Sequence, residues 1–121
     1  MIMNTVKNKV QLVGNVGMTP ELRDFNNGRK VARFSIATHD YYKNAAGERV
    51  QQTHWFMVVA WNGLADTAME KLQQKGTEVA VNGKLISRSY QDKNGQKRTM
   101  VEVLAGELLL VEDEAKAQVN S

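Results

Sequence analysis

The sequence predicts a small all-β barrel with one helix, and three observations lead to that fold class. First, His54 to Trp61 is almost entirely apolar and too rich in aromatic and β-branched residues for a typical helix. Second, three predicted strands precede one helix, and two further strands follow it. Third, the chain has 121 residues and no cysteine, enough for one domain whose core needs neither disulfides nor thiolate-bound metal.

The first half of the chain predicts two strands around an irregular segment. Residues 5–13 alternate apolar and polar side chains, which indicates a half-buried strand, and Gly14–Gly17 is expected to end it in a turn. Pro20 and the run Asn26-Asn27-Gly28 predict a loop or an irregular excursion. A second strand is expected from about Lys30 to Tyr41.

The apolar stretch forms the next strand and leads into the helix. A polar loop over residues 42–51 is expected to join the second strand to a third, from 52 to 61, in a long hairpin. Asn62 is predicted to cap the following helix and Gly76 to end it. The helix has an apolar stripe of Leu64, Ala65, Ala68 and Leu72.

Two strands complete the predicted barrel. Residues 77–91 form the fourth strand, 92–95 a hairpin turn with the sequence Asp-Lys-Asn-Gly, and 96–111 the fifth strand. Five strands with a helix between the third and fourth predict the five-stranded Greek-key OB-fold barrel. We therefore expect residues 1–111 to form the domain and the polar residues 112–121 to form a short, disordered C-terminal tail.

The third strand is apolar on both of its faces. Side chains alternate across a strand, so Phe56, Val58 and Ala60 share one face and are predicted to meet the barrel core, or partly a neighbouring subunit. The opposite face carries Trp55, Met57, Val59 and Trp61. A sheet strand needs only one face for its own core, so the face with both tryptophans predicts a second packed layer, a subunit interface or a surface on which flat ligands stack.

Charge and aromatic residues indicate which kind of ligand such a surface would bind. Residues 1–101 carry 15 Lys and Arg against 8 Asp and Glu, a net charge of +7, whereas residues 102–121 carry −4. A basic body suits a polyanion, although ordinary solubilising charge is an equally good explanation of charge alone.

Tyr90 shares a strand face with Lys84 and Arg88. An aromatic ring among cations is what single-stranded nucleic acid needs, because bases stack on rings while cations follow the phosphates. Tyr41 and Tyr42 are further stacking candidates. For the three phenylalanines we expect packing in the core or between subunits instead; these are Phe25, Phe34 and Phe56.

The sequence offers little for catalysis, metal binding or membrane insertion. His39, Asp40, His54 and Asp66 lack metal-ligand spacing and paired carboxylates, so we expect surface or hydrogen-bonding roles and neither metal nor cofactor. No run approaches a membrane span, and the first residues lack the apolar core of a signal peptide. We expect a soluble, intracellular protein.

The sequence resembles the bacterial single-stranded DNA-binding protein family. Residues 8–17 (NKVQLVGNVG), 31–38 (VARFSIAT) and 52–55 (QTHW) are similar to family motifs, as are 83–90 (GKLISRSY) and 92–96 (DKNGQ). The resemblance runs in order from about residue 5 to 111. It implies an OB-fold homotetramer that wraps single-stranded DNA without sequence preference in replication, recombination and repair, in the cytoplasm and associated with the nucleoid.

The resemblance also implies particular binding residues. Trp55, Trp61, Tyr42 and Tyr90 fall at base-stacking positions, and the tyrosines replace larger tryptophans, so we expect weaker stacking there. The matching basic positions are Lys75 and Arg88, with Lys9 and Arg33 as lesser candidates. Lys84 joins them because it shares the strand face of Arg88 and Tyr90. Two positions depart from the family pattern. Met57 stands where some members carry an arginine, and Phe56 stands where some carry a histidine at a subunit contact.

The end of the chain departs from the family pattern as well. Members usually finish in an acidic tip ending Pro-Phe, which recruits replication and repair enzymes, whereas this sequence ends in residues 115–121, AKAQVNS. Either the sequence is truncated or the protein is a member without that tip, such as one carried on a mobile element.

The function predicted from the sequence is non-catalytic, sequence-independent binding of single-stranded DNA. Two alternatives stay open within binding: an OB-fold RNA-binding protein and a primosome-type accessory protein that bridges other proteins. A third, from a different class, is a nuclease that uses His39, Asp40 or His54.

Overall fold

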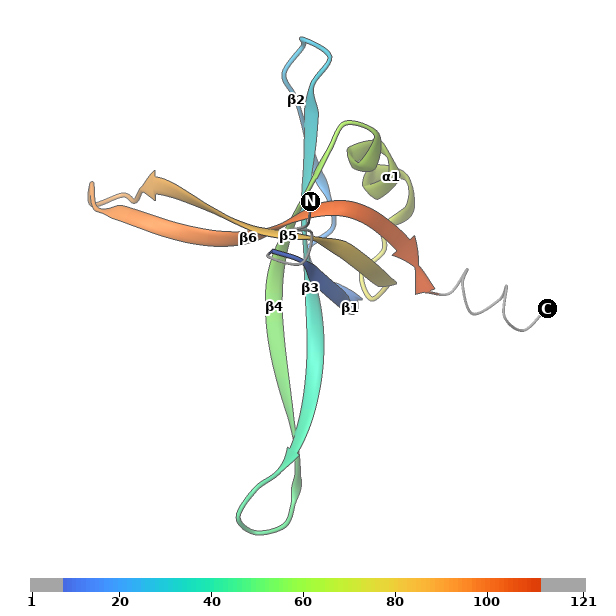
Figure 1. Cartoon of the computed structure of the whole chain (residues 1–121), viewed down its shortest axis with the longest axis vertical. Helices are drawn as coiled ribbons and strands as arrows, with labels where there is room; N and C mark the ends of the chain where they lie inside the picture. Colours follow the sequence, from blue (N-terminus) through green and yellow to red (C-terminus); the bar gives the residue numbers. More distant parts are fainter. Residues whose placement is uncertain (1–7, 112–121) are drawn as a thin grey trace, which may run out of the picture.

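The computed structural model describes residues 8–111, and this part of the chain forms an all-β barrel with one helix (Figure 1). Its elements in chain order are β1 (Val10–Val16), β2 (Glu21–Asp24), β3 (Lys30–Lys43), β4 (Arg49–Trp61), α1 (Gly63–Lys71), β5 (Glu78–Gln91) and β6 (Lys97–Leu110). The predicted tail, residues 112–121, lies outside the described residues.

The strands close on themselves because β1 pairs with two partners. The sheet runs in the order β1-β5-β6-β4-β3-β2, and β1 also pairs with β3. Five strands thus form the closed barrel, while β2 lies outside it on the free edge of β3. The β4–β6 pairing is parallel and short, with Val58 opposite Val103. This topology confirms the OB-fold class, with the helix between the barrel strands formed by β4 and β5.

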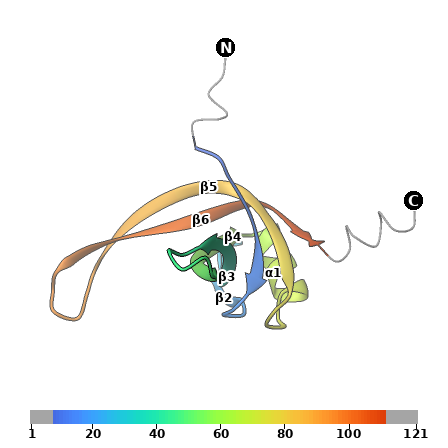
Figure 2. The same ribbon diagram turned by 90° about the horizontal axis from the view of Figure 1, so that it is seen from below.

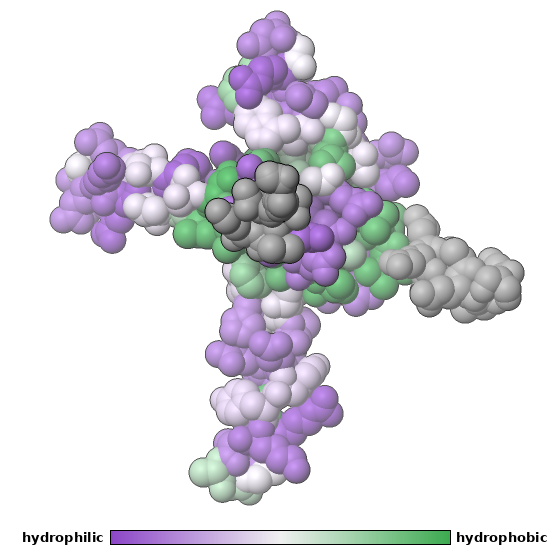
Figure 3. All heavy atoms as spheres, viewed as in Figure 1, coloured by the Kyte–Doolittle hydropathy of each residue, from purple (hydrophilic) through white to green (hydrophobic). Residues whose placement is uncertain are grey.

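Three two-stranded ribbons extend beyond the barrel. Figure 1 shows the long β3–β4 hairpin on one side, the short β2–β3 hairpin opposite it, and the β5–β6 hairpin nearly at right angles to both. Seen from below, β5 and β6 arch over the β3–β4 ribbon (Figure 2). The ribbons are predominantly hydrophilic, whereas apolar residues gather around the barrel (Figure 3).

The core lies inside the barrel and under the helix. Phe34, Ile36, Val58 and Ala60 are fully buried, as the alternation of the sequence predicts. Phe56 is partly buried and packs against this core, which confirms that its face of β4 points inward. The helix contributes the buried side chains Ala65 and Ala68, and Leu72, directly after its last residue, is buried as well.

The predicted turn at Gly14–Gly17 is wrong, because β1 continues to Val16. Within this stretch β1 moves from β5 to β3, with Asn15 opposite both Glu78 and Ala37. A Cβ on Gly14 would lie 2.5 Å from the carbonyl oxygen of Ala37. Glycine is therefore needed here for the close backbone approach that seals the barrel, and not for a turn.

The expected irregular excursion after Pro20 contains a strand, β2. Its four residues pair with β3, from Glu21 opposite Arg33 to Asp24 opposite Lys30. All four side chains of β2 are exposed, so the strand lacks the apolar alternation by which a sequence reveals a strand.

The helix begins where predicted, at Gly63 directly after Asn62, but the predicted capping bond and the predicted end at Gly76 are wrong. Asn62 makes no side-chain capping bond and has a φ of 53°. Its Oδ1 instead accepts the Lys30 N–H at 3.2 Å, which fixes the chain where it leaves β4. The helix ends at Lys71, and Gly76 lies in the following turn, where its N–H donates to the Val16 carbonyl at 2.8 Å.

A bulge in β6 changes which of its side chains face the core. Opposite β5, Glu107 pairs with Asn82 and Ala105 with Gly83, so Gly106 is the extra residue. Val103 and Ala105 are buried before the bulge, whereas Leu108 and Leu110 pack against the core after it. Val101, which the sequence groups with Val103, is 59% exposed because the ribbon has left the barrel there.

The Gly14→Ala variant tests the seal between β1 and β3. A methyl group that collides with the Ala37 carbonyl forces the two backbones apart, so we expect the free energy of unfolding to fall by about 1–3 kcal/mol in urea denaturation. Gly63→Ala is the matched control, because nothing lies within 4 Å of its Cβ position. Equal stability of the two variants would contradict the close approach.

Candidate nucleic-acid interface

One outer face of the barrel collects most of the predicted binding residues. On β4 this face carries Trp55, Met57, Val59 and Trp61, and β3 places Arg33 opposite Val59. On the other side of β4, Val59 pairs with Leu104 of β6, and Leu104 pairs in turn with Lys84 of β5. The same alternation brings Arg88 and Tyr90 of β5 to this side. We call this surface the tryptophan face.

Trp55 presents the most open ring on the tryptophan face. It is 62% exposed, and its six-membered ring lies on the backbone of Gly17. A Cβ on Gly17 would lie 2.3 Å from Cζ3 of that ring. Gly17 is held in place because its N–H donates to the Ser35 carbonyl at 2.9 Å. One surface of the indole is thus supported while much of the ring stays open to solvent.

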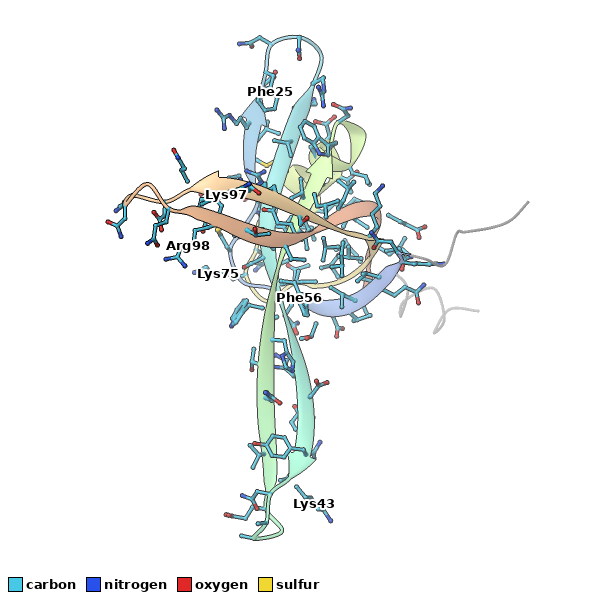
Figure 4. All side chains as sticks on the ribbon, turned by 60° about the vertical axis from the view of Figure 1, so that its left-hand side comes forward. Phe25, Lys43, Phe56, Lys75, Lys97 and Arg98 are labelled. Atoms are coloured by element: carbon cyan, nitrogen blue, oxygen red, sulfur yellow. The ribbon has the colours of Figure 1, made fainter. Side chains whose placement is uncertain are left out.

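Trp61, six residues further along β4, is already covered by neighbours. Phe25 stacks on it with ring centroids 6.1 Å apart and planes 20° from parallel, and the Arg29 guanidinium lies 4.9 Å from its ring. Phe25 does not pack in the barrel core, one of the two places expected for it: it is 43% exposed, on the hairpin that joins β2 to β3 (Figure 4). Packing of Phe25 between subunits stays a prediction.

A buried carboxylate holds two arginines on the tryptophan face. The Glu102 side chain is only 1% exposed; its Oε1 accepts a 3.0 Å bond from Arg88 Nε, and its Oε2 lies 3.8 Å from Arg33 Nε. Both arginines remain about 40% exposed. Two cations offset one buried anion, so the cluster keeps a net positive charge directed at solvent.

Sequence reasoning missed Glu102, because an acid in a strand is ordinarily solvent-exposed. One signal was present in the sequence: Glu102 alternates with Val101 and Val103, which places it on the opposite side of β6 from the core residue Val103. Its pairing with the arginines depends on strand register, which a sequence pattern does not provide.

The remaining candidates on β5 lie near this cluster. The Arg88 guanidinium is 6.0 Å from the centre of the Tyr90 ring, which is 43% exposed. Lys84 and Lys9 line one shallow hollow of about 370 Å³ near the β5–β6 bulge. The side chain of Asn8 fixes the start of β1 there through two hydrogen bonds to the backbone of Leu85.

Lys75 lies in a loop at one end of the barrel. It is exposed in the segment between α1 and β5, and the adjacent Gly76 is bound to β1 through Val16 and through Asn15, whose Nδ2 donates to the Gly76 carbonyl at 3.0 Å. Val16 directly precedes Gly17, the residue under Trp55. Lys75 therefore belongs to the same end of the barrel as Trp55.

Tyr42 lies apart from the other candidates. It is 50% exposed near the tip of the β3–β4 hairpin, and it pairs with Val50, on the side of the ribbon that carries Phe56. Tyr41 points to the Trp55 side, with the Arg49 guanidinium 4.2 Å from its ring. The tyrosines thus contribute to opposite sides of this ribbon.

The tip of the β5–β6 hairpin adds cations that the sequence analysis did not select. Lys97 and Arg98 lie on this ribbon (Figure 4). Arg98 donates to Asp92 at 2.9 Å, and this bond, together with the Gln96 N–H, lowers the pKa of the Asp92 carboxyl. Asp92 also accepts the Asn94 N–H, so one ionised side chain organises the whole turn.

The histidines form hydrogen bonds on the β3–β4 ribbon. His54 Nε2 lies 3.1 Å from Asp40 Oδ2, and His39 Nδ1 contacts Thr53 and Gln51. Within residues 8–111, no three side chains of His, Cys, Asp or Glu come together as a metal site. In the same part of the chain, no helix has the length and apolar character needed to cross a membrane.

The closed barrel and its exposed strand face define this chain as an OB-fold domain. More specifically, the chain belongs to the single-strand binding protein family, whose model matches residues 7–111. This family assignment confirms the resemblance seen in the sequence motifs.

Individual relatives agree with the family. A protein of Neisseria meningitidis named single-stranded DNA-binding protein is 38% identical over 86% of this chain and 59% of its own length. One from Xylella fastidiosa, named single-stranded DNA-binding protein 1, is 38% identical over 86% of this chain and 76% of its own length. The chain thus spans about three fifths of the Neisseria relative.

A solved structure shares the fold. It is described as the Plasmodium falciparum SSB complex with ssDNA, and it matches with a TM-score of 0.77 and 29% sequence identity. The match covers 91% of this chain and 98% of that one.

Replacing Glu102 by Gln tests the charge balance of the arginine cluster. The amide keeps the shape of the side chain but removes the charge that faces Arg33 and Arg88, so we expect the free energy of unfolding to fall by about 1–2 kcal/mol in urea. Glu70→Gln, at an exposed position of α1, is the control. If both variants unfold at the parent's urea midpoint, the buried ion pairs contribute nothing to stability.

Proposed function

We propose that this protein binds single-stranded DNA without sequence preference, through the tryptophan face. One observation carries the proposal: the exposed ring of Trp55, supported from below by Gly17, lies on the same face of the barrel as the partly exposed Arg33 and Arg88. A base can stack on that ring while the guanidiniums contact the backbone phosphates. The family and the names of the relatives support the same function.

The geometry suits binding that tolerates any sequence. Every base has a π-face, so stacking on Trp55 and Tyr90 needs no particular base. Glu102 pre-orients Arg88 through a 3.0 Å hydrogen bond, which lowers the entropy lost when the arginine meets a phosphate. Lys75, Lys84 and Lys9 extend the basic surface around this centre and follow the strand as point charges.

Tyr42 and Trp61 take more distant roles in this proposal. Tyr42, toward the tip of the β3–β4 ribbon, meets DNA that has passed beyond the barrel. Trp61 is covered by Phe25 and Arg29, so it contributes to the surface mainly by supporting them. We place no catalytic step in this function: the protein protects single strands during replication, recombination and repair by binding alone, in the cytoplasm with the nucleoid.

Replacing Trp55 by Ala tests the stacking role. We expect oligo-dT affinity to fall by about 1–3 kcal/mol, the usual contribution of one base on one aromatic ring. Fluorescence anisotropy with a labelled oligonucleotide measures the change, and Trp55→Phe, which keeps a ring, should recover most of the affinity. Unchanged binding by Trp55→Ala would remove this ring from the interface. Stronger binding to rU than to dT would favour the RNA-binding alternative.

We propose further that the protein is a homotetramer. Leu85 and Val101 are 43% and 59% exposed on the side of the β5–β6 ribbon that continues the core face of the barrel. Val13 and Leu109 are exposed apolar residues as well. Apolar side chains presented along extended strands need a cover, and symmetric copies of the same chain supply one.

Light scattering of the DNA-free protein tests the assembly. A tetramer has four times the 13.6 kDa mass of the chain. Val101→Lys should shift the mass toward smaller species, because a charge on the ribbon opposes burial of its apolar side. A parent protein that scatters as a single chain would reject the tetramer.

A further inference from the structure

We propose that Phe25, with Arg23 and Arg29, forms an additional single-stranded DNA contact on the β2–β3 hairpin, which extends the tryptophan face beyond the barrel. The inference rests on the proposed function, since it concerns the path of the same ligand. It assigns the outermost stacking ring at this end to Phe25 and not to Trp61.

The hairpin tip holds Phe25 in a defined position. The Phe25 N–H donates to the Arg29 carbonyl at 2.9 Å and closes the turn. Inside the turn, Asp24 Oδ1 accepts the Asn26 N–H at 2.8 Å, and Asn27 Oδ1 accepts the Arg29 N–H at 3.2 Å. A ring presented on such a locally bonded turn is ordered before the ligand arrives, which reduces the entropy cost of binding.

The Trp61 ring is partly covered by neighbouring side chains, whereas much of the Phe25 ring is exposed to solvent. The two rings are nearly parallel, 20° apart, with centroids separated by 6.1 Å, and Arg29 occupies further space over the indole at 4.9 Å. Trp61 is only partly exposed, whereas 43% of Phe25 is accessible. A base that joins this stack therefore meets Phe25 first, on the part of the ring that the Arg23 guanidinium, 5.5 Å from its centroid, leaves accessible. The indole supports the phenyl ring from the barrel side.

The charges around Phe25 suit a phosphate backbone. The Arg23 guanidinium is 5.5 Å from the Phe25 ring, and neither Arg23 nor Arg29 forms a salt bridge with any residue that the structure describes. The neighbouring cation Lys30 differs, because it is paired with Asp66 at 2.7 Å. Two unpaired guanidiniums beside an exposed ring reproduce the ring-and-cation combination found at Arg88 and Tyr90.

The hairpin is continuous with the rest of the tryptophan face. Arg23 of β2 pairs with Val31 of β3, and Val31 pairs on its other side with Trp61 of β4. A shallow hollow of about 310 Å³, lined in part by Arg23 and Arg33, connects the hairpin to the arginine cluster. Glu21 also lines this hollow, so the phosphates are expected to follow its arginine side. A strand bound at Arg33 can therefore continue to Phe25 without crossing an uncharged gap.

Phe25 variants measured with a short and a long oligo-dT test this inference. For Phe25→Ala we expect affinity for the long strand to fall about 5-fold or more, the usual loss on removing one stacking ring. A short strand can be bound by the Trp55 region alone, so its affinity should fall less. Phe25→Tyr, which keeps the ring, should bind like the parent, and matching melting temperatures should show that the variants are folded.

Phe25→Leu separates stacking from structural support. Leucine still covers Trp61 with apolar surface but offers no ring to a base, so we expect it to bind as weakly as Phe25→Ala. Full recovery by leucine would overturn the proposal and make Phe25 a cover for Trp61. Parent-like binding of the long strand by Phe25→Ala would overturn it as well. If the parent itself binds no oligo-dT, the proposed function fails instead.

Discussion

The double pairing of β1 is the constraint on which the other features of this molecule depend. β1 pairs with β5 along most of its length and with β3 at its end, and the contact is possible because Gly14 has no side chain to strike the Ala37 carbonyl. Closure sets the strand registers, and the registers decide which side chains lie together. The same closure places Gly17 beneath the Trp55 ring.

Burial of a single carboxylate gives the outer face its electrostatic character. Glu102 is nearly inaccessible, yet the two arginines that compensate it are not. An unpaired buried carboxylate would be costly, so both Arg88 and Arg33 lie near it, and the hydrogen bond from Arg88 aligns that arginine before any ligand binds. Stability of the barrel and readiness for a polyanion thus have the same origin.

Aromatic residues on this face divide into open and supporting rings. Trp55 and Tyr90 are open to solvent, and Phe25 is open at the end of the β2–β3 hairpin. Trp61 supports Phe25 and is itself partly covered. The position of a ring in a sequence pattern therefore does not tell whether a base can reach it, because accessibility depends on what packs over the ring.

The sequence by itself determined the barrel class, the inward face of β4 and the two faces of β5, because alternation and turn chemistry are local properties. It also indicated Trp55, Arg88 and Tyr90 as one type of surface. Only the tertiary structure decided that Glu102 is buried between arginines, that β2 forms on an edge without an apolar pattern, and that Phe25 covers Trp61. Each of these depends on pairing between residues distant in the chain, and strand register, which closure imposes, is absent from any local pattern.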